Sequence, residues 1–191
     1  MRAFLAIDLP ENLKEKIFAF SQKIARQGEV KLVEKENLHL TLLFLGEINE
    51  GEKKKVLEVL ESLGRLGEIK LRLGKVEFFP DRKKPHGIWI KVEGEKEKLF
   101  ALYKRIVEGV FRAGIGLAEK ELRFSPHITI GRMRKNIQSF DFKEEVGLEG
   151  EEFLVERVVF FKSELSAKGP KYSKIAEFVP NIAGLLNLFQ I

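Results

Sequence analysis

The sequence predicts a fold that mixes helices and strands in one domain with two similar halves. Segments with apolar residues at helical spacing alternate with segments rich in β-forming residues. The motif His-x-Thr occurs twice, at His39 and at His127, although the chain has only three histidines and two threonines. The motifs lie 88 residues apart, near half of the 191-residue chain, with no linker between them. We therefore expect a single domain, residues 1–191, with an internal duplication that places one motif in each half.

The first third of the chain predicts strands and helices in alternation. Residues 2–8 predict a short strand, and Pro10 suits the first turn of a helix, where its missing N–H would have no partner. That helix ends at Gly28 and has an apolar stripe made of Leu13, Ile17, Phe20 and Ile24. Residues 37–46 predict the strand of the first motif, and residues 52–63 predict a second helix. The helices carry one apolar face each, so we expect them to pack on a sheet.

The rest of the chain predicts further strands and a third helix. The expected strands are residues 69–79, 87–92, 125–134, 152–162 and 172–178, and the expected helix is residues 96–112. Residues 162–171 predict a loop between the last two strands that closes one end of a cleft. The apolar tail at residues 183–189 is expected to dock on the domain.

Two features between the strands at 69–79 and 87–92 have alternative interpretations. The basic turn at residues 81–86 either contacts an RNA backbone or is a solvated hairpin tip. His86 has no threonine two residues on, so we do not expect it to be catalytic. Trp89 either stacks on a base or packs within the protein, and its alternation with Ile88 and Ile90 favours packing.

The two motifs predict an acid/base site. In a strand, residues i and i+2 project from the same face, so His39 and Thr41 point away from the apolar neighbours Leu38, Leu40 and Leu42. His127 and Thr129 are placed in the same way. If the two strands face each other across a cleft, two imidazoles and two hydroxyls converge. One neutral and one charged imidazole would then accept and donate protons near neutral pH, and the hydroxyls would bind developing negative charge.

Composition sets limits on the class of protein. Apolar residues make up 44% of the chain, which is enough for a sizeable core. The absence of cysteine excludes disulfides, thiolate metal sites and a cysteine nucleophile. The net charge of +5 permits RNA binding but also fits an ordinary basic enzyme. The apolar run after Arg2 is too short for a signal sequence, and no run approaches a membrane span, so we expect a soluble cytoplasmic protein.

The duplicated motif with its flanks resembles the 2H phosphoesterase superfamily. Within it, the likeness is greatest to the RNA 2′,3′-cyclic phosphodiesterases, also called 2′-5′ RNA ligases, and it extends over nearly the whole chain. The segments that carry it are Phe-Leu-Ala-Ile-Asp-Leu-Pro at 4–10, Glu-Asn-Leu-His-Leu-Thr-Leu-Leu-Phe-Leu-Gly at 36–46, Phe79-Pro80 with Ile88-Trp89, Ser-Pro-His-Ile-Thr-Ile-Gly-Arg at 125–132, Ser-Glu-Leu-Ser at 163–166, and Gly-Pro-Lys-Tyr at 169–172. The chain departs from the family at Leu32 and Val33, where an aromatic residue is frequent, and at His86, where arginine is frequent.

This resemblance implies an α+β fold with two pseudo-symmetric lobes of mainly antiparallel sheet, with outer helices around a central groove. It implies hydrolysis of RNA 2′,3′-cyclic phosphate ends to 2′-phosphate, with 2′-5′ ligation of tRNA fragments as a further activity. His39 would be the proton donor and His127 the proton acceptor, although the reverse reaction exchanges these roles. Thr41 and Thr129 would bind the phosphate.

Several points stay open at this stage. Arg132 is a candidate for substrate binding or for a structural ion pair, because strict alternation places it on the face opposite His127. Neither a cofactor nor a metal is required, and we expect a monomer whose partner is RNA and not a membrane. The alternatives are a cyclic phosphodiesterase that acts on a small nucleotide, and a non-catalytic RNA-binding module.

Overall fold

The computed structural model describes residues 1–26, 29–64, 67–80, 85–117, 124–133, 147–166, 169–179 and 186–188 of the chain. Its elements in chain order are β1 (Arg2–Asp8), α1 (Glu11–Ala25), β2 (Val30–Leu32), the 3₁₀ turn η1 (Lys35–Asn37), β3 (His39–Glu47), α2 (Glu50–Ser62), β4 (Lys70–Phe79), β5 (Gly87–Gly94), α3 (Lys96–Arg112), β6 (His127–Met133), β7 (Glu152–Leu154), β8 (Arg157–Ser166), β9 (Gly169–Phe178) and β10 (Leu186–Leu188). The α+β fold predicted from the sequence is confirmed.

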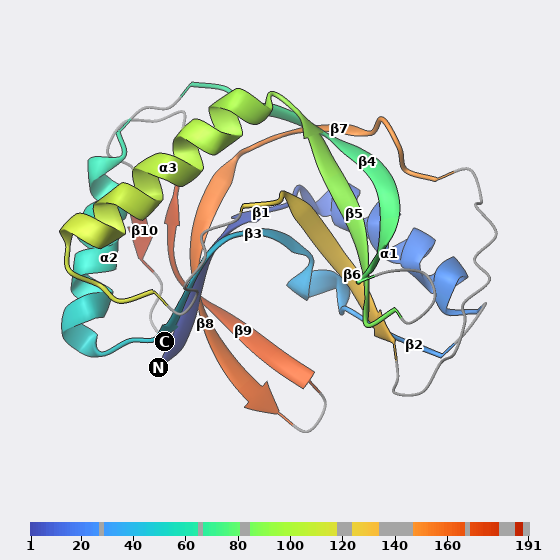
Figure 1. Ribbon diagram of the computed structural model, residues 1–191, viewed down its shortest axis with the longest axis horizontal. Helices are drawn as coiled ribbons and strands as arrows, with labels where there is room; N and C mark the ends of the chain where they lie inside the picture. The colour runs from blue at the N-terminus through green and yellow to red at the C-terminus, as the bar shows by residue number, and fades with distance from the viewer. Residues whose placement is uncertain are drawn as a thin grey trace.

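All strands belong to one curled antiparallel sheet, and the motif strands lie at its middle (Figure 1). The order is β10-β9-β8-β1-β3-β6-β5-β4-β7, with β2 beside β6. The two halves join at β6, which meets β3 through the residue pair Leu40 and Ile128 and pairs with β2 further along its length. The motif strands are therefore neighbours in one sheet, and not strands that face each other across a cleft.

The two halves have the same local order around their motifs. In the first half, α1 lies between β1 and β3 in the chain, and these two strands pair antiparallel in the sheet. In the second half, α3 lies between β5 and β6 in the chain, and those two strands also pair antiparallel. Asp8 lies opposite His39, and Lys91 lies opposite His127. This correspondence agrees with an internal duplication, which stays a prediction.

The helices contact elements of both halves. The helix α1, which follows β1, contacts β2, η1 and β6, whereas α3, which precedes β6, contacts α2 and β3. One continuous set of buried apolar side chains draws residues from both halves, from Leu5 and Leu40 to Ile90 and Ile128. The halves therefore share a core on the side of the sheet that the helices cover, and the opposite face is left for the motif side chains.

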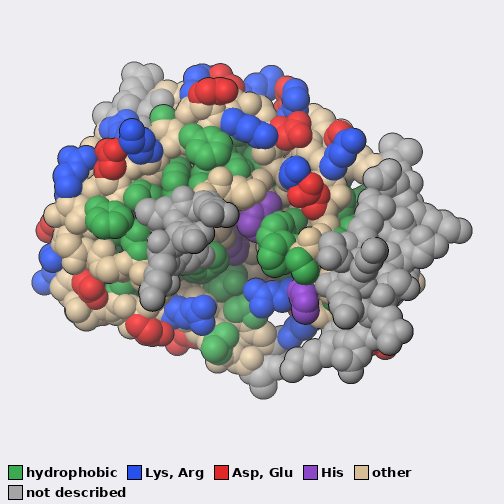
Figure 2. Space-filling model, in the orientation of Figure 1, with side chains coloured by type: hydrophobic (Ala, Val, Ile, Leu, Met, Phe, Trp, Pro, Cys, Tyr) green, Lys and Arg blue, Asp and Glu red, His purple; other side chains and the backbone are tan. Residues whose placement is uncertain are grey.

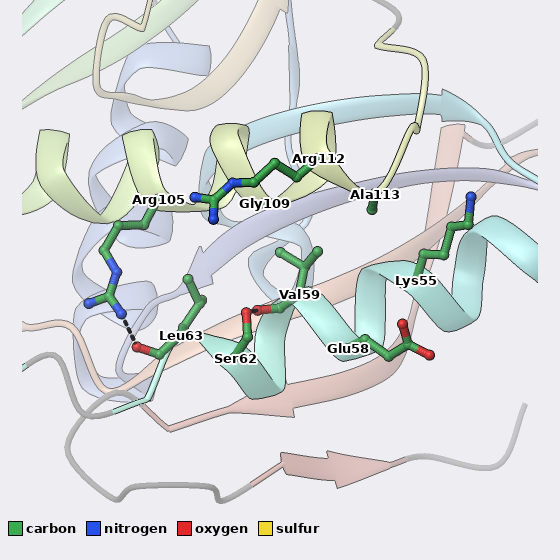
Figure 3. A pocket seen from close by; sticks show the side chains of 9 residues that line it. All are labelled: Lys55, Glu58, Val59, Ser62, Leu63, Arg105, Gly109, Arg112 and Ala113. Atoms are coloured by element: carbon green, nitrogen blue, oxygen red, sulfur yellow. Dashed lines mark hydrogen bonds between the residues drawn. The ribbon is translucent and has the colours of Figure 1, made fainter.

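The contact between α2 and α3 depends on a glycine and a helix cap (Figure 3). A Cβ atom at Gly109 would lie 2.6 Å from Cγ1 of Val59, so the absence of a side chain lets the two helices approach closely. The guanidinium of Arg105 donates a hydrogen bond to the carbonyl of Leu63, just after the last turn of α2. At the other end of α2, Asn49 and Glu52 form a capping box.

The structure departs from the sequence prediction in several places, each for an identifiable reason. The second helix starts at Glu50 because Asn49 caps it. The strand expected at 152–162 is two strands, because the chain changes its pairing partner. Residues up to Val155 lie beside β4 and the residue before it, as β7, and the chain then crosses to β1, with which β8 pairs. The loop expected at 162–171 is wrong: β8 and β9 keep pairing out to Ser166 and Gly169.

Some expectations lie outside the described residues or were not made. The helix end at Gly28, residues 81–84 of the basic turn expected at 81–86, and most of the tail at 183–189 are outside the described part. Of that tail, Leu186–Leu188 forms β10, which pairs with β9. The short elements β2 and η1 were not predicted. Both lie beside the motif strands, where β2 pairs with β6.

We expect Gly94→Ala to lower the free energy of unfolding by about 2–4 kcal/mol. Gly94 has φ +104°, and a Cβ atom there would lie 2.7 Å from the carbonyl oxygen of Lys70 and 2.9 Å from Cα of Leu71. The matched control is Gly116→Ala, because a Cβ at that position meets nothing within 4 Å. Urea unfolding of the three proteins measures the effect, and equal stability of both variants would contradict this account of the β5–α3 turn.

Candidate active site

The four motif side chains lie together on one face of the sheet. Leu40 and Ile128, which pair across the join, are completely buried on the core side. In an antiparallel pair the flanking residues project from the other face, so His39 is placed beside Thr129 and Thr41 beside His127. All four side chains are half-buried. The predicted separation of these polar residues from Leu38, Leu40 and Leu42 is confirmed, because all three leucines are buried.

Both imidazoles are held in the same way by the backbone two residues earlier. Nδ1 of His39 lies 2.7 Å from the carbonyl oxygen of Asn37, and Nδ1 of His127 lies 2.7 Å from that of Ser125. A carbonyl oxygen only accepts, so each Nδ1 carries the proton that it donates. The Nε2 atoms are then the ones available for proton exchange. That of His39 lies 3.0 Å from Oγ1 of Thr41.

The environment of His39 favours its neutral form. Burial lowers the pKa of His39 to about 4, and the neighbouring Lys14 and His127 act in the same direction. The carbonyl of Asn37 and the carboxylate of Asp8 oppose this effect but do not outweigh it. At neutral pH the free protein therefore holds His39 as an imidazole with a proton on Nδ1, and Nε2 accepts the hydroxyl proton of Thr41.

Aromatic rings enclose His39. The ring centroids of Phe4, Tyr172 and Phe161 lie 5.0, 5.5 and 6.1 Å from that of His39. Phe4 and Phe161 belong to a small apolar cluster that is separate from the main core, and Tyr172 packs against it. This cluster supplies the burial that keeps His39 uncharged.

His127 lies against one end of an aromatic stack. Its ring is 4.0 Å from that of Trp89, and Trp89 is 4.5 Å from Phe79 on its other side, with all three rings nearly parallel. Trp89 is therefore on the histidine face and not in the core. Phe79 is 49% exposed, so the outer end of the stack is open to solvent.

A β-bulge turns Arg132 towards the histidines. Thr129 of β6 pairs with Trp89 of β5, and Gly131 pairs with Ile88, so β6 has one extra residue, Ile130, between two consecutive residues of β5. Ile130 and Gly131 are both buried on the core side. Alternation restarts after the bulge, so Arg132 projects from the same face as His127. The positive charge of Arg132 acts on the hydroxyl of Tyr172, whose pKa burial raises. Arg132 therefore lies on the histidine face, and its role in substrate binding stays a prediction.

The first motif has a bulge at the equivalent position. The register of β1 against β3 shifts between Leu5 and Ala6, so Leu42 and Leu43 are both buried and Phe44 returns to the histidine face. Phe44 is 42% exposed and lies next to Phe4. The residue three positions after each threonine therefore faces the site, and it is aromatic in one half and cationic in the other.

An ionic network lies beside His39. Asp8, which is opposite His39 in the sheet, accepts from Nζ of Lys14 at 2.6 Å and from Nζ of Lys174 at 2.8 Å. Burial by itself raises the pKa of Asp8, but the two lysines hold it below its ordinary value. Lys174 also bonds to the buried Glu177 at 2.8 Å. These charges compensate one another, so Asp8 is not free to act as a base.

The third histidine is not part of this group. The backbone of His86 bonds to Phe79 and Met133, and its side chain is exposed.

Figure 2 shows histidine side chains inside a hollow near the middle of one face, with Lys and Arg side chains beyond its rim. Among the described residues, no group of three or more His, Asp or Glu side chains has the arrangement of a metal site. In the same residues, no helix is long and apolar enough to cross a membrane.

Comparison with known proteins identifies the family. The model of the LigT-like phosphoesterases matches residues 7–89. An RNA 2′,3′-cyclic phosphodiesterase of Methanocaldococcus jannaschii is 36% identical over 182 residues, which cover 93% of this chain and 100% of that protein. This chain belongs to the LigT-like phosphoesterase family.

Further LigT-like relatives agree. An RNA 2′,3′-cyclic phosphodiesterase of Archaeoglobus fulgidus is 32% identical over 93% of this chain and 99% of that protein. The crystal structure of a Thermus thermophilus protein superposes with a TM-score of 0.79 at 30% identity, and covers 95% of this chain and 99% of that one. The structure of E. coli LigT complexed with 3′-AMP has a TM-score of 0.76 at 22% identity and covers 93% of this chain and 97% of that one, which supports the LigT-like fold alone.

We expect the stability of this LigT-like protein to fall as the pH drops from about 6.5 towards 4, partly through His39. Its pKa is lower in the folded than in the unfolded chain, so the unfolded chain binds more protons in this range. When the pH is lowered from 7.5 to 5, the unfolding free energy of both proteins should fall. The fall should be smaller in His39→Gln than in the native protein, by about 1–2 kcal/mol. The control His86→Gln should lose as much as the native protein. Urea titrations at both pH values decide, and equal losses in all three proteins would contradict a lowered pKa.

Proposed function

We propose that this protein is an RNA 2′,3′-cyclic phosphodiesterase that leaves a 2′-phosphate on the RNA end. The observation that carries the proposal is the pairing of Leu40 with Ile128, which sets two imidazoles and two hydroxyls on one face. Each imidazole has its Nδ1 tied to a carbonyl, so each has one nitrogen directed to proton exchange. The names of the 36% and 32% identical relatives support the same activity.

In the proposed reaction, a water oxygen attacks phosphorus while the bond from phosphorus to the ribose 3′ oxygen breaks. His127 accepts the proton of the water through Nε2, and His39 donates a proton to the departing 3′ oxygen. The hydroxyls of Thr41 and Thr129 donate hydrogen bonds to the non-bridging oxygens, where negative charge increases. Arg132 adds a positive charge to the same face.

The lowered pKa of His39 sets a condition on this assignment. A proton donor has to be charged when the substrate is bound, whereas His39 is neutral in the free protein at neutral pH. An anionic phosphate beside the ring raises the pKa of an imidazole, because an opposite charge stabilises the protonated form. We infer that His39 gains its proton as the cyclic phosphate binds in the site. The aromatic enclosure then strengthens the attraction between the two charges.

The same site supports ligation. If the 5′-hydroxyl of a second RNA replaces water, the product is a 2′-5′ linkage, and no nucleotide activation is needed because the cyclic phosphate supplies the leaving oxygen. We propose tRNA fragments in the cytoplasm as substrates, acted on by a monomeric enzyme. The two histidines exchange roles in the reverse direction.

We expect His39→Ala and His127→Ala each to lower kcat by about 10²–10⁴-fold, because each removes one proton-transfer group. Thr41→Val and Thr129→Val should cost less, about 10- to 100-fold, since each removes one neutral hydrogen bond to the phosphate. Steady-state hydrolysis of a nucleoside 2′,3′-cyclic phosphate measures the effect, with His86→Ala as the control for loss of an imidazole. Near-native turnover in either motif-histidine variant would remove that residue from the mechanism.

We also expect a single product isomer. Because only the 3′ oxygen receives a proton in the proposed geometry, a cyclic-ended oligonucleotide should yield the 2′-phosphate. Chromatography against authentic 2′- and 3′-phosphate standards distinguishes the two. A 3′-phosphate, or an equal mixture of both, would be incompatible with the assignment of the leaving oxygen.

A further inference from the structure

We propose that Lys31 and Arg132 form a second anion site beside the motif quartet, which binds the backbone phosphate on the 5′ side of the cyclic end of a single-stranded RNA. The proposal rests on the function proposed above, because it assumes that the ligand is an RNA strand with its end among the histidines. It adds that the preferred substrate has at least two nucleotides. A cyclic mononucleotide has no phosphate to place there.

The sheet brings these two side chains together. Lys31 lies directly opposite Arg132 where β2 pairs with β6. Arg132 faces the histidine side because of the bulge at Ile130 and Gly131. Val30, the neighbour of Lys31, packs against the core, so Lys31 points to the other side of the sheet. The two cations therefore share the face on which the catalytic quartet lies.

The charges of this pair are not balanced. Within the described part of the chain, neither Lys31 nor Arg132 forms an ion pair, in contrast to Lys14 and Lys174, which both pair with Asp8. Like charges directly opposite each other in an antiparallel ladder destabilise the pairing. An anion between them would remove that repulsion and would accept hydrogen bonds from both side chains.

The hairpin formed by β8 and β9 borders the same place. The side-chain amide of Asn37 donates to the carbonyl of Pro170 at 3.3 Å, which ties the hairpin to the turn before His39. Nζ of Lys31 would lie 3.5 Å from a Cβ atom on Gly169. In Figure 1 the outer end of the hairpin extends away from the rest of the sheet. Lys31 thus lies between the hairpin and Arg132, at the end of the site.

The spacing matches the next phosphate of a strand and not the reacting one. Thr129 lies opposite Trp89, and Arg132 lies opposite Gly87, so the two are separated by two residues of β5, about 7 Å along the strand. A side chain at this distance reaches past the group held by Thr129. A strand that runs from the cyclic end towards Lys31 and Arg132 in its 5′ direction would bring its next phosphate to these two side chains.

The test compares three substrates that end in a 2′,3′-cyclic phosphate: a mononucleotide, a trinucleotide, and the same trinucleotide with a neutral methylphosphonate at the linkage before the cyclic end. We expect the native protein to prefer the trinucleotide to the other two by about tenfold in kcat/KM, which corresponds to about 1.4 kcal/mol. Lys31→Glu should lose this preference and keep native turnover of the mononucleotide. Lys104→Glu, the same charge change on the exposed side of α3, is the control and should behave as the native protein does.

Equal losses of Lys31→Glu on all three substrates, or no loss on any, would overturn the proposal. Binding of the same trinucleotides with a 2′-phosphate end, measured by fluorescence anisotropy of a 5′ label, separates it from the proposed reaction. The native protein could turn over none of the substrates and still bind the phosphate form about tenfold more tightly than the methylphosphonate form, while Lys31→Glu binds both forms equally. That result would support the anion site and contradict the proposed reaction. Indifference of the native protein in both assays would rule the anion site out.

Discussion

The candidate site depends on one contact between strands, the pairing of Leu40 with Ile128. Both side chains are completely buried, and they form the only register pair between β3 and β6 among the described residues. Because the pleat reverses direction at each residue, burial of this pair forces its neighbours His39, Thr41, His127 and Thr129 onto the opposite face. A slip of one residue would turn these polar groups into the core, so the hydrophobic core enforces the geometry of the polar site.

Identical motifs acquire different chemistry from their surroundings. Each histidine is held by a carbonyl two residues before it, and each strand has a bulge directly after its threonine. His39, however, is enclosed by Phe4, Phe161 and Tyr172, and this burial lowers its pKa. His127 instead stacks on Trp89, in a row of rings that reaches solvent at Phe79. The packing around each motif, and not the motif, therefore distinguishes the two imidazoles.

The sequence allowed the periodic features to be predicted and not those that depend on distant pairing. The bounds of α3 and the facing of His39 and Thr41 follow from spacings of 3.6 and 2 residues, which are local. The direction of Arg132 was not predictable, because a bulge appears only when two strands of unequal residue count pair. Residues 162–171 were expected as a loop between two strands, yet β8 and β9 pair with each other out to Ser166 and Gly169, which only the pairing of the two strands reveals. The β2 strand is three residues long and has meaning only beside β6.

The two histidines and two threonines of the motifs alone cannot determine the orientation in which a phosphate binds. A pair of His-x-Thr strands related by a two-fold axis presents the same groups to a phosphate in either orientation. Direction therefore has to come from positions where the halves differ, and the residue after each bulge is one of these: Phe44 in the first half and Arg132 in the second. The first half offers aromatic surface around His39, whereas the second offers a cation that Lys31 reinforces from β2. If the ligand is the RNA end proposed above, its bases and phosphates lie at different distances from the reacting group and therefore fit the two halves differently. On that proposal the orientation of the strand decides which ribose oxygen lies next to which histidine, so residues outside the motifs select the proton donor.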